Sequence, residues 1–339
     1  MWASFFVHKT SGFGNAMCKK EVWKMCTAVC YKTKGTYFGR NLDLETSYEE
    51  SVVVVPRFFP LSFRFKSSKT EHYAIIGAAY VKDGYPLFFD AMNEQGIGMA
   101  GLAFEGNAVY HEVREGKDNI TPYELIPWVL SQCGTMDEVR ELLSDIQIAD
   151  VPFSEHIPNQ PLHFMVSDGN CSLVIESVQE GIRIYENPVG VLTNNPPFPY
   201  QMFYLGRYMR LTREYPVSTF AEGLALEVTS NGMGAIGLPG DLSSPSRFVR
   251  AAFIRMNAVS GEGEGESVNQ FFHILGAVEQ QKGCVRTENG DYEYTVYSSC
   301  MSLTRGIYYY VTYDNRKIRS VNLKQTEYKG RQLQSFRLV

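Results

Sequence analysis

Three residues close together in the sequence, Cys26, Arg40 and Asp43, could carry out amide chemistry. A cysteine thiolate is a strong nucleophile, and an arginine beside it favours the ionised sulfur. If Cys26 were the first residue of the mature chain, its α-amino group, with a reference pKa of about 7.7–8, could act as the base. The Asp43 carboxylate could then hold that amine in place. This combination predicts nucleophilic acyl transfer that needs no distant histidine.

Each of these residues also has a structural interpretation. A lone cysteine is usually a small buried apolar residue. Arg40 and Asp43 could pair with each other at the surface, where such pairs contribute little to stability. The position of Cys26 decides between the two interpretations, because a nitrogen inside a peptide bond has no useful basicity.

The segment before Cys26 predicts that this cysteine becomes N-terminal. Residues 1–25 show no helical or strand periodicity, and their lysines follow the short apolar stretch, unlike in a secretory signal peptide. Residues 19–22 can be encoded by a sequence containing the ribosome-binding string AGGAGG, a few bases before the codon of Met25. We therefore expect translation to start at Met25, residues 1–25 to be non-native or removed, and residues 26–339 to form a single domain.

The composition excludes several classes of partner. The net charge of -5 argues against nucleic acid, because there is no basic excess to neutralise phosphates. No apolar run is long enough to span a bilayer, so no membrane partner is expected. The 7 cysteines are irregularly spaced without a CxxC pair, which predicts neither a disulfide framework nor a zinc site. A reducing cytoplasm fits this pattern, and no metal or organic cofactor is expected.

Alternating apolar runs predict the strands that position these residues. Residues 26–31 and 36–43 are expected to form a hairpin around Lys34-Gly35, so that Arg40 lies on the strand beside the cysteine. Further strands are expected at 51–55, 74–80, 87–92, 98–104, 162–167, 172–176, 292–301, 306–313 and 318–323.

Helical patterns occupy the middle of the chain. One helix begins after Thr121, where Pro122 and Glu124 complete a capping box. The Gly/Glu repeat at 261–266 is expected to be a mobile acidic surface loop. Strands, then helices, then strands predict an α+β domain. The other helices are expected at 135–146, 200–212, 246–257 and 268–278.

The opening MCTAV followed by TYFGRNLD resembles the choloylglycine hydrolases, which include bile salt hydrolases and penicillin V acylases among the N-terminal-nucleophile (Ntn) hydrolases. The resemblance implies a four-layer αββα sandwich of the α+β class. It also implies hydrolysis of glycine- or taurine-conjugated bile salts through a thioester intermediate. It continues in order through FFDAMNEQGIGMAGLAFEG, VPFSEHIPNQPLHFMVSDG, VGVLTNNPPF, IGLPGDLSSPSRFVRAAF and SSCMSLTRGIYYYVTYDN.

The resemblance implies roles for single residues. Asn194 would donate a side-chain N–H to the oxyanion, and Arg247 would add positive charge; otherwise they would be a turn asparagine and a surface arginine. Ala103 stands where bile salt hydrolases usually carry asparagine and penicillin V acylases often carry tyrosine. Alanine keeps the backbone N–H that would be the second oxyanion donor. The catalytic set implied in this way is Cys26, Arg40, Asp43, Ala103, Asn194 and Arg247.

A steroid acid would need an apolar wall, since its burial is driven by apolar area. Taken alone, each candidate is better explained as a core residue. The alternatives are a penicillin V or other N-acyl amidase, and a non-catalytic steroid- or lipid-binding protein if Cys26 is not N-terminal. The resemblance also implies a homotetramer. The wall candidates are Leu42, Leu44, Phe89, Phe153, Ile157 and Leu162.

Overall fold

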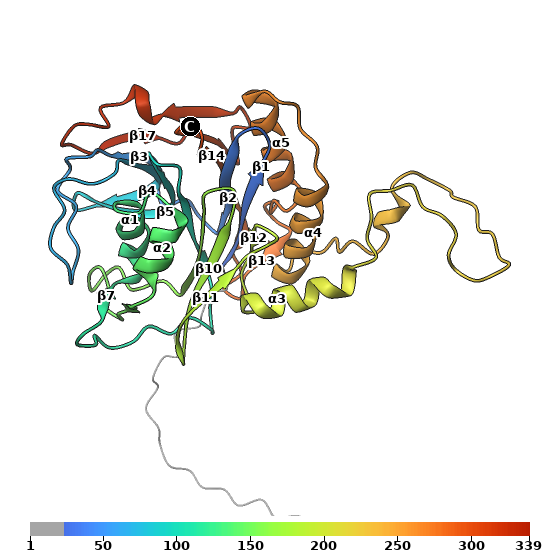
Figure 1. Ribbon diagram of the computed structural model, residues 1–339, viewed down its shortest axis with the longest axis horizontal. Coiled ribbons are helices and arrows are strands. Elements are labelled where there is room, and N and C mark those ends of the chain that lie inside the picture. The colour runs from blue at the N-terminus through green and yellow to red at the C-terminus, as the bar shows by residue number, and fades with distance from the viewer. Residues whose placement is uncertain (1–23) are drawn as a thin grey trace, which may run out of the picture.

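Two β-sheets pack face to face between layers of helices in the structure, a computed structural model that describes residues 24–339 (Figure 1). Of the predicted leader, only Lys24 and Met25 fall within the described residues. The strands of both sheets are antiparallel, and a separate parallel pair joins β7 (Asp118–Ile120) to β8 (Ile146–Ile148).

The first sheet carries Cys26 on β1. Within residues 24–339 this sheet has seven strands, and β13 (Val285–Arg286) pairs beside β14. The order of the other strands is β12 (Val191–Leu192), β1 (Met25–Lys32), β2 (Thr36–Leu44), β14 (Tyr292–Ser302), β15 (Ile307–Thr312) and β16 (Arg319–Asn322).

The second sheet packs its inner face against β1 and β2 through β5 and β6. Within the same described residues it has eight strands. Their order is β11 (Gly181–Glu186), β10 (Ser172–Val178), β9 (Leu162–Ser167), β6 (Gly98–Ala103), β5 (Tyr85–Asn93), β4 (Ile75–Lys82), β3 (Ser51–Val55) and β17 (Gln334–Arg337).

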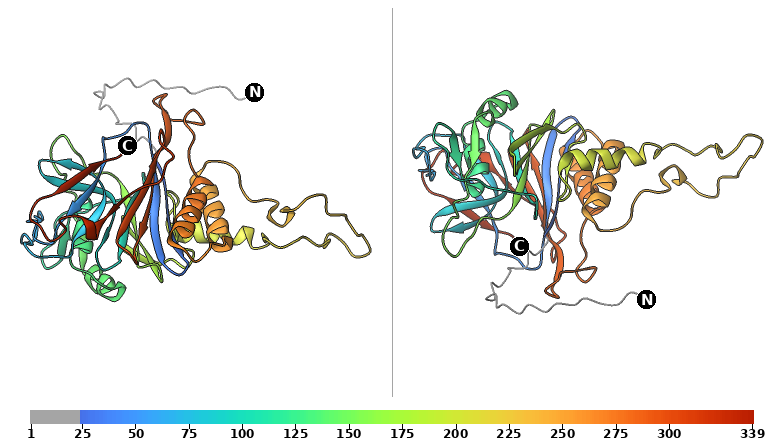
Figure 2. Two further views of the ribbon diagram at one scale, coloured as in Figure 1. Left: turned by 90° about the horizontal axis from the view of Figure 1, so that it is seen from above. Right: turned by 90° about the horizontal axis from the view of Figure 1, so that it is seen from below.

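Helices cover the outer faces of both sheets (Figure 2). The helices α4 (Ser244–Asn257) and α5 (Glu264–Gly276) pack on β1, β2 and β14, and α3 (Phe198–Leu205) lies beside α4. On the other side, α1 (Leu125–Leu130) packs on β5 and β6, with α2 (Met136–Leu143) in the same core cluster. The result is an αββα sandwich, as predicted.

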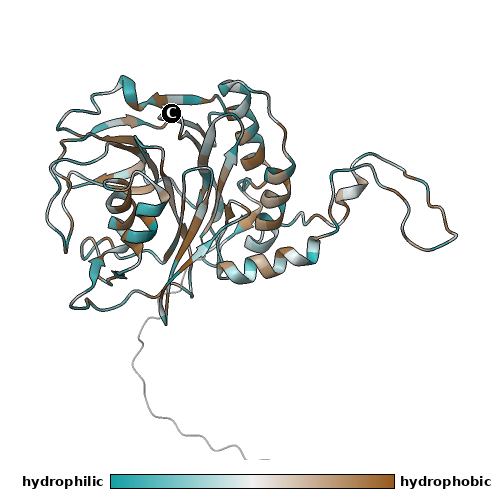
Figure 3. Cartoon of the chain, in the orientation of Figure 1, coloured by the Kyte–Doolittle hydropathy of each residue, from teal (hydrophilic) through white to brown (hydrophobic). Residues whose placement is uncertain are grey.

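The β3 strand shows why the middle layers form. Its side chains alternate between the two faces of the sheet, as they do in any strand. Val52 and Val54 join the core shared with the first sheet, whereas Val53 and Val55 join the core under α1 and α2. A continuous β-branched run therefore fits a strand that is buried on both faces. Figure 3 shows the apolar residues concentrated in these inner strands.

Most predicted strands are confirmed, whereas one predicted loop and the ends of two predicted helices need correction. The acidic repeat at 261–266 is not wholly a loop, because α5 begins at Glu264 and Glu266 Oε2 accepts a hydrogen bond from Gly263 N at 3.0 Å. Carboxylates in a first helical turn are favoured by the helix dipole. The helix expected at 135–146 ends at Leu143, and the one expected at 200–212 ends at Leu205.

Residues 209–240 form an arm that projects from the sandwich beyond α3 (Figure 1, Figure 2). Its regular structure is limited to the short 3-10 helix Met233–Ala235 and one isolated bridge between Ala221 and Leu224. Elsewhere in the described part of the chain, no helix is long and apolar enough to cross a bilayer.

Candidate active site

The hairpin of β1 and β2 places the Arg40 guanidinium beside the Cys26 thiol. Cys26 pairs with Leu42, and Ala28 pairs with Arg40. Because side chains alternate along a strand, Arg40 lies on the same face as Cys26 while Asp43 lies on the opposite face. Arg40 Nη2 donates to Cys26 Sγ at 2.5 Å.

Four groups fix the plane of the Arg40 side chain. Besides the thiol, it donates to Gly101 O at 2.5 Å, Phe89 O at 3.1 Å and Asn41 O at 3.2 Å. Burial raises the pKa of the Cys26 thiol, and the positive charge of Arg40 opposes that rise. The arginine is 1% exposed, so the surface-pair interpretation of Arg40 and Asp43 is wrong.

Asp43 is buried on the far side of β2. Its Oδ1 accepts a hydrogen bond from Thr295 Oγ1 at 2.6 Å, and its Oδ2 has no hydrogen-bond partner in the structure, which describes residues 24–339. Burial raises the pKa of Asp43 to about 6, with the charge of Arg247 acting against it. The Cys26 nitrogen donates instead to Asn194 Oδ1, at 2.9 Å. The predicted role of Asp43 in holding a free amine therefore stays a prediction.

Asn194 and Ala103 meet at the cysteine, as the resemblance implies. Asn194 Nδ2 donates to Ala103 O at 2.8 Å. A primary amide has two N–H donors, so a second one remains beyond this contact. Against the effect of burial, the backbone N–H groups of Ala103 and Asp43 lower the pKa of the thiol, so both lie within reach of the sulfur. Backbone N–H groups thus reach the sulfur, while Asn194 Oδ1 accepts from the nitrogen of the same cysteine.

Arg247 enters from the first turn of α4 and joins the loop carrying Asn194 to the nucleophile strand. It is 0% exposed, which rules out a surface arginine. Its guanidinium donates to Cys26 O at 2.6 Å, Thr27 Oγ1 at 2.6 Å and Asn194 Oδ1 at 2.7 Å. Ser244 Oγ, on the same turn, accepts from Asn194 N at 2.9 Å. The structure therefore brings all six predicted catalytic residues together.

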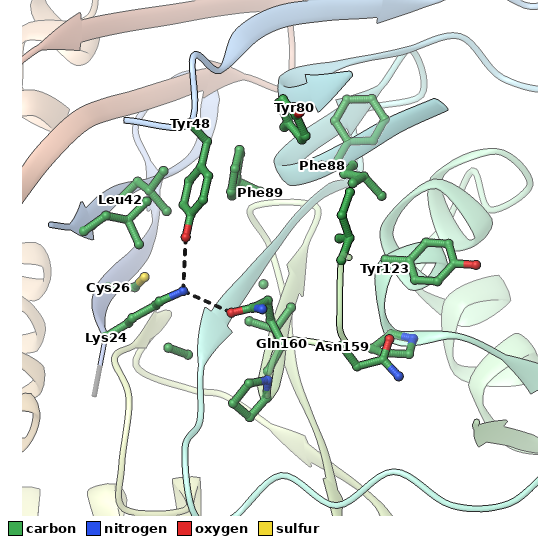
Figure 4. Close-up of a pocket in the computed structure, with 18 of the residues that line it drawn as sticks. Lys24, Cys26, Leu42, Tyr48, Tyr80, Phe88, Phe89, Tyr123, Asn159 and Gln160 are labelled. Carbon is green, nitrogen blue, oxygen red and sulfur yellow. Dashed lines mark hydrogen bonds between the residues drawn. The ribbon is translucent and has the colours of Figure 1, made fainter. Parts of the chain in front are cut away.

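A pocket opens over Cys26 and Arg40 between β2, β5 and the loop at 151–161 (Figure 4). All six predicted wall residues line it, although only Leu42 and Leu44 among them are fully buried. Several other lining residues were not predicted, and the aromatic-rich stretch 85–89 was an available signal for Leu87 and Phe88. The additional apolar and aromatic lining residues include Tyr48, Tyr80, Leu87, Phe88, Tyr123 and Phe164.

Lys24, two residues before Cys26, lines the same pocket, and Met25 contacts a buried carboxylate outside it. Lys24 Nζ donates to Gln160 Oε1 at 3.0 Å and to Tyr48 OH at 3.4 Å, so that its side chain bridges two lining residues beside the thiol (Figure 4). The backbone N of Met25 donates to the carboxylate of Glu293. Within residues 24–339, no cluster of three or more His, Cys, Asp or Glu side chains is arranged to hold a metal ion.

Three buried polar residues near the site were also missed. Asp90, His163 and Glu176 are each 0% exposed and interrupt otherwise apolar strands. Asp90 accepts hydrogen bonds from the hydroxyls of Tyr308 at 2.7 Å and Ser299 at 2.9 Å, and its charge acts on Arg40. A polar residue in a fully buried strand must find partners, and this was the available signal.

The buried Glu293 carboxyl is expected to make the stability of the fold depend on pH. Burial, with the negative charge of Asp43, raises its pKa from 4.5 to about 8, so the folded chain binds this proton more tightly than the unfolded chain. The stabilisation from this proton is complete below the ordinary pKa of 4.5. It is lost as the pH rises through the folded-state pKa of about 8. Within this window, one such group lowers the free energy of unfolding by about 1.4 kcal/mol per pH unit.

The measurement is chemical denaturation of the full chain and of Glu293→Gln between pH 5 and pH 9. Glutamine keeps an acceptor for Met25 N but does not ionise. We expect the variant to gain stability relative to the wild type as pH rises. A constant difference across this range would contradict the raised pKa.

The geometry of the site by itself defines a class of protein. A buried cysteine at the start of a central strand of an αββα sandwich, with converging donors, is the arrangement of the Ntn amide hydrolases. The family model for linear amide C–N hydrolases, choloylglycine hydrolase family, matches residues 26–336.

Relatives and solved structures agree with that match. A bile salt hydrolase/transferase of Lactiplantibacillus plantarum is 51% identical over 314 residues, which are 93% of this chain and 97% of that protein. One of Clostridium perfringens is 39% identical over 92% of this chain and 97% of its own. A crystal structure of a conjugated bile acid hydrolase variant from Clostridium perfringens superposes with a TM-score of 0.85 at 36% identity, covering 93% and 97% of the two chains.

The fold extends to a more distant structure. The penicillin V acylase of Agrobacterium tumefaciens superposes with a TM-score of 0.72 at 17% identity, over 92% of this chain and 90% of that one. The chain belongs to the choloylglycine hydrolase family of linear amide C–N hydrolases. It is an enzyme that hydrolyses linear amide bonds.

Proposed function

We propose that this enzyme hydrolyses bile salts conjugated to glycine or taurine, with Cys26 as an N-terminal nucleophile. The observation that carries the proposal is the buried Cys26 thiol, which accepts a hydrogen bond from Arg40. It lies beneath a pocket lined mainly by apolar and aromatic side chains. The relatives named as bile salt or conjugated bile acid hydrolases support the choice of substrate.

The proposed reaction needs a chain that begins at Cys26. Its free amine takes the proton of the thiol, and the thiolate attacks the carbonyl carbon of the amide. The second N–H of Asn194 Nδ2 and the backbone N–H of Ala103 stabilise the oxyanion. The protonated amine then gives its proton to the departing glycine or taurine nitrogen as the C–N bond breaks. Water, with the amine as base, hydrolyses the thioester and releases the bile acid.

The proposed start at Cys26 has two supports. The family model begins its match at residue 26. The 314 residues aligned with the Lactiplantibacillus plantarum relative account for 97% of that protein, so the rest of this chain has almost no counterpart there. We propose that residues 1–25 are non-native or removed, and that residues 26–339 form the single catalytic domain.

The experiment that tests the substrate is a paired assay on the chain beginning at Cys26. Release of glycine or taurine from glycocholate and taurocholate is compared with hydrolysis of penicillin V. We expect conjugated cholates to be turned over with the higher kcat/KM. Turnover of penicillin V alone would replace this substrate with the N-acyl amidase alternative, and binding of cholates without any hydrolysis would indicate the non-catalytic alternative.

Ile157 offers a test of the apolar wall because it lines the pocket from a loop, outside both core clusters. Ile157→Ala removes apolar contact worth about 1–3 kcal/mol, so KM for glycocholate should rise about tenfold while kcat changes little. Ile318, 38% exposed and outside the pocket lining, provides the control. Equal kinetics for Ile157→Ala and Ile318→Ala would place the steroid elsewhere.

We also propose that the enzyme assembles as a homotetramer and works in the cytoplasm. The arm at 209–240 supports self-association, because it exposes large apolar side chains that a partner copy could cover. Light scattering should give about four times the mass of one chain beginning at Cys26, which is the 38.4 kDa of the full sequence less residues 1–25. A mass of one chain would contradict the tetramer. The large exposed apolar residues of the arm are Met209, Tyr215, Val217, Phe220, Leu224, Leu226 and Ile236.

A further inference from the structure

We propose that His163 and Glu176 form a buried positioning pair that holds both oxyanion donors of the active site. The two residues lie on neighbouring strands, β9 and β10, and both are 0% exposed. Neither touches the pocket lined by Cys26. The inference rests on the proposed roles of Asn194 and Ala103 as sources of those donors.

One nitrogen of the histidine holds the chain directly before Asn194. His163 Nε2 lies 2.9 Å from Thr193 O. Since a carbonyl oxygen only accepts, Nε2 carries the proton and donates it in this hydrogen bond. The other nitrogen, Nδ1, lies 3.2 Å from Glu176 Oε1. A single proton between these two atoms leaves the buried pair with no net charge, which suits its complete burial.

The Glu176 carboxylate holds the other end of the segment that carries Asn194. Glu176 Oε1 also accepts a hydrogen bond from Phe198 N at 2.8 Å, at the first residue of α3. The pair therefore fixes Thr193 through the imidazole and Phe198 through the carboxylate. Asn194 lies between Thr193 and Phe198, the two residues that these contacts hold. Its side-chain amide consequently has a defined position relative to Cys26.

The same imidazole supports the second donor through stacking. The ring of Phe104 lies parallel to that of His163, with centroids 4.3 Å apart and an interplanar angle of 6°. Phe104 directly follows Ala103, whose backbone N–H lies near the thiol. One ring thus connects both donors: it bonds to the residue before Asn194 and stacks on the residue after Ala103.

Stability alone gives little reason for this arrangement. Replacing a buried charged or polar pair by well-packed apolar residues is often neutral or stabilising. In contrast, oxyanion donors must be held closely, because a misplacement of about 1 Å can cost about a hundredfold in rate. The pair supplies that precision at both ends of the Asn194 segment.

Two substitutions of the histidine separate positioning from simple loss of the ring. Glutamine places its amide nitrogen near the position of Nε2 and can still donate to Thr193 O, whereas asparagine reaches only the position of Nδ1. We expect His163→Asn to lower kcat by about 10- to 100-fold with KM changed less than threefold. His163→Gln should retain most of the wild-type kcat.

The control for fold damage is His72→Asn. His72 is also buried, and its ring nitrogens contact Tyr73 O at 2.7 Å and Phe59 O at 2.9 Å, away from the pocket. It should lose thermal stability as His163→Asn does but keep its kcat. The rate of Cys26 alkylation by iodoacetamide should be unchanged in His163→Asn, because the nucleophile and Arg40 are intact.

The test of the positioning role does not depend on which amide the enzyme hydrolyses. Wild-type enzyme that fails on glycocholate contradicts the proposed substrate only, and the variants are then compared on penicillin V. Crystal structures give a readout that needs no substrate: Asn194 should be displaced in His163→Asn and retained in His163→Gln. Equal kcat in the two variants, or an unmoved Asn194 in His163→Asn, would overturn the positioning role.

Discussion

Replacing Cys26 with alanine is expected to abolish amide hydrolysis. The substitution removes the sulfur that Arg40 Nη2 contacts at 2.5 Å and leaves nothing in the pocket floor to form a thioester. Losing a catalytic nucleophile can cost on the order of 10⁶ in kcat, as it does in a serine protease. Release of glycine from glycocholate by the purified variant measures the effect.

Cys30 provides a matched control on the same strand. It is buried four residues further along β1, its Sγ lies 3.3 Å from Ser172 Oγ, and it lies outside the pocket. Cys30→Ala should therefore keep most of the turnover. Acid quenching during turnover should trap an added acyl mass on the wild type and none on Cys26→Ala. Turnover by Cys26→Ala, or equal losses in both variants, would refute Cys26 as the nucleophile.

The local half of this site could be predicted because a hairpin is a local structure. The turn at Lys34-Gly35 sets the register that pairs Cys26 with Leu42, and that register brings Arg40 to the thiol face. The same alternation turns Asp43 to the opposite face, toward Thr295 and Arg247. The predicted role of Asp43 in holding a free Cys26 amine stays a prediction, because the nitrogen in the structure is a peptide nitrogen that donates to Asn194 Oδ1.

The distant half could not be predicted from patterns along the chain. Asn194 and Arg247 lie 168 and 221 residues beyond Cys26, yet both bond to it. No periodicity carries information about such pairings, so only the family resemblance could place these two residues at the site. Taken alone, their sequence context favours a turn asparagine and a surface arginine.

The arm and the acidic repeat show a third limit. A sequence pattern at 200–212 favours a helix, but beyond Leu205 the chain leaves the core and loses the packing that stabilises most helices. At 261–266, composition favoured a loop, whereas the helix dipole and the apolar face of α5 selected a helix from Glu264. Tertiary packing decided both cases.

A chain that keeps residues 1–25 is expected to be inactive, whereas one translated from Met25 should be fully active. In the longer chain the nitrogen of Cys26 is an amide that donates to Asn194 Oδ1 and cannot accept the thiol proton. Lys24 additionally bridges Tyr48 and Gln160 in the pocket. Intact mass should show that the shorter chain has lost Met25 and begins at Cys26.

Lys24→Ala in the full-length chain separates the two causes of this inactivity. The substitution removes the bridge across the pocket and leaves the peptide bond at Cys26 unchanged. We expect it to restore cholate binding, measured by calorimetry, without restoring hydrolysis, because the missing group is the free amine. Hydrolysis by intact full-length Lys24→Ala, with its mass unchanged, would mean that the leader only blocks the pocket and that the base is a group other than the Cys26 amine.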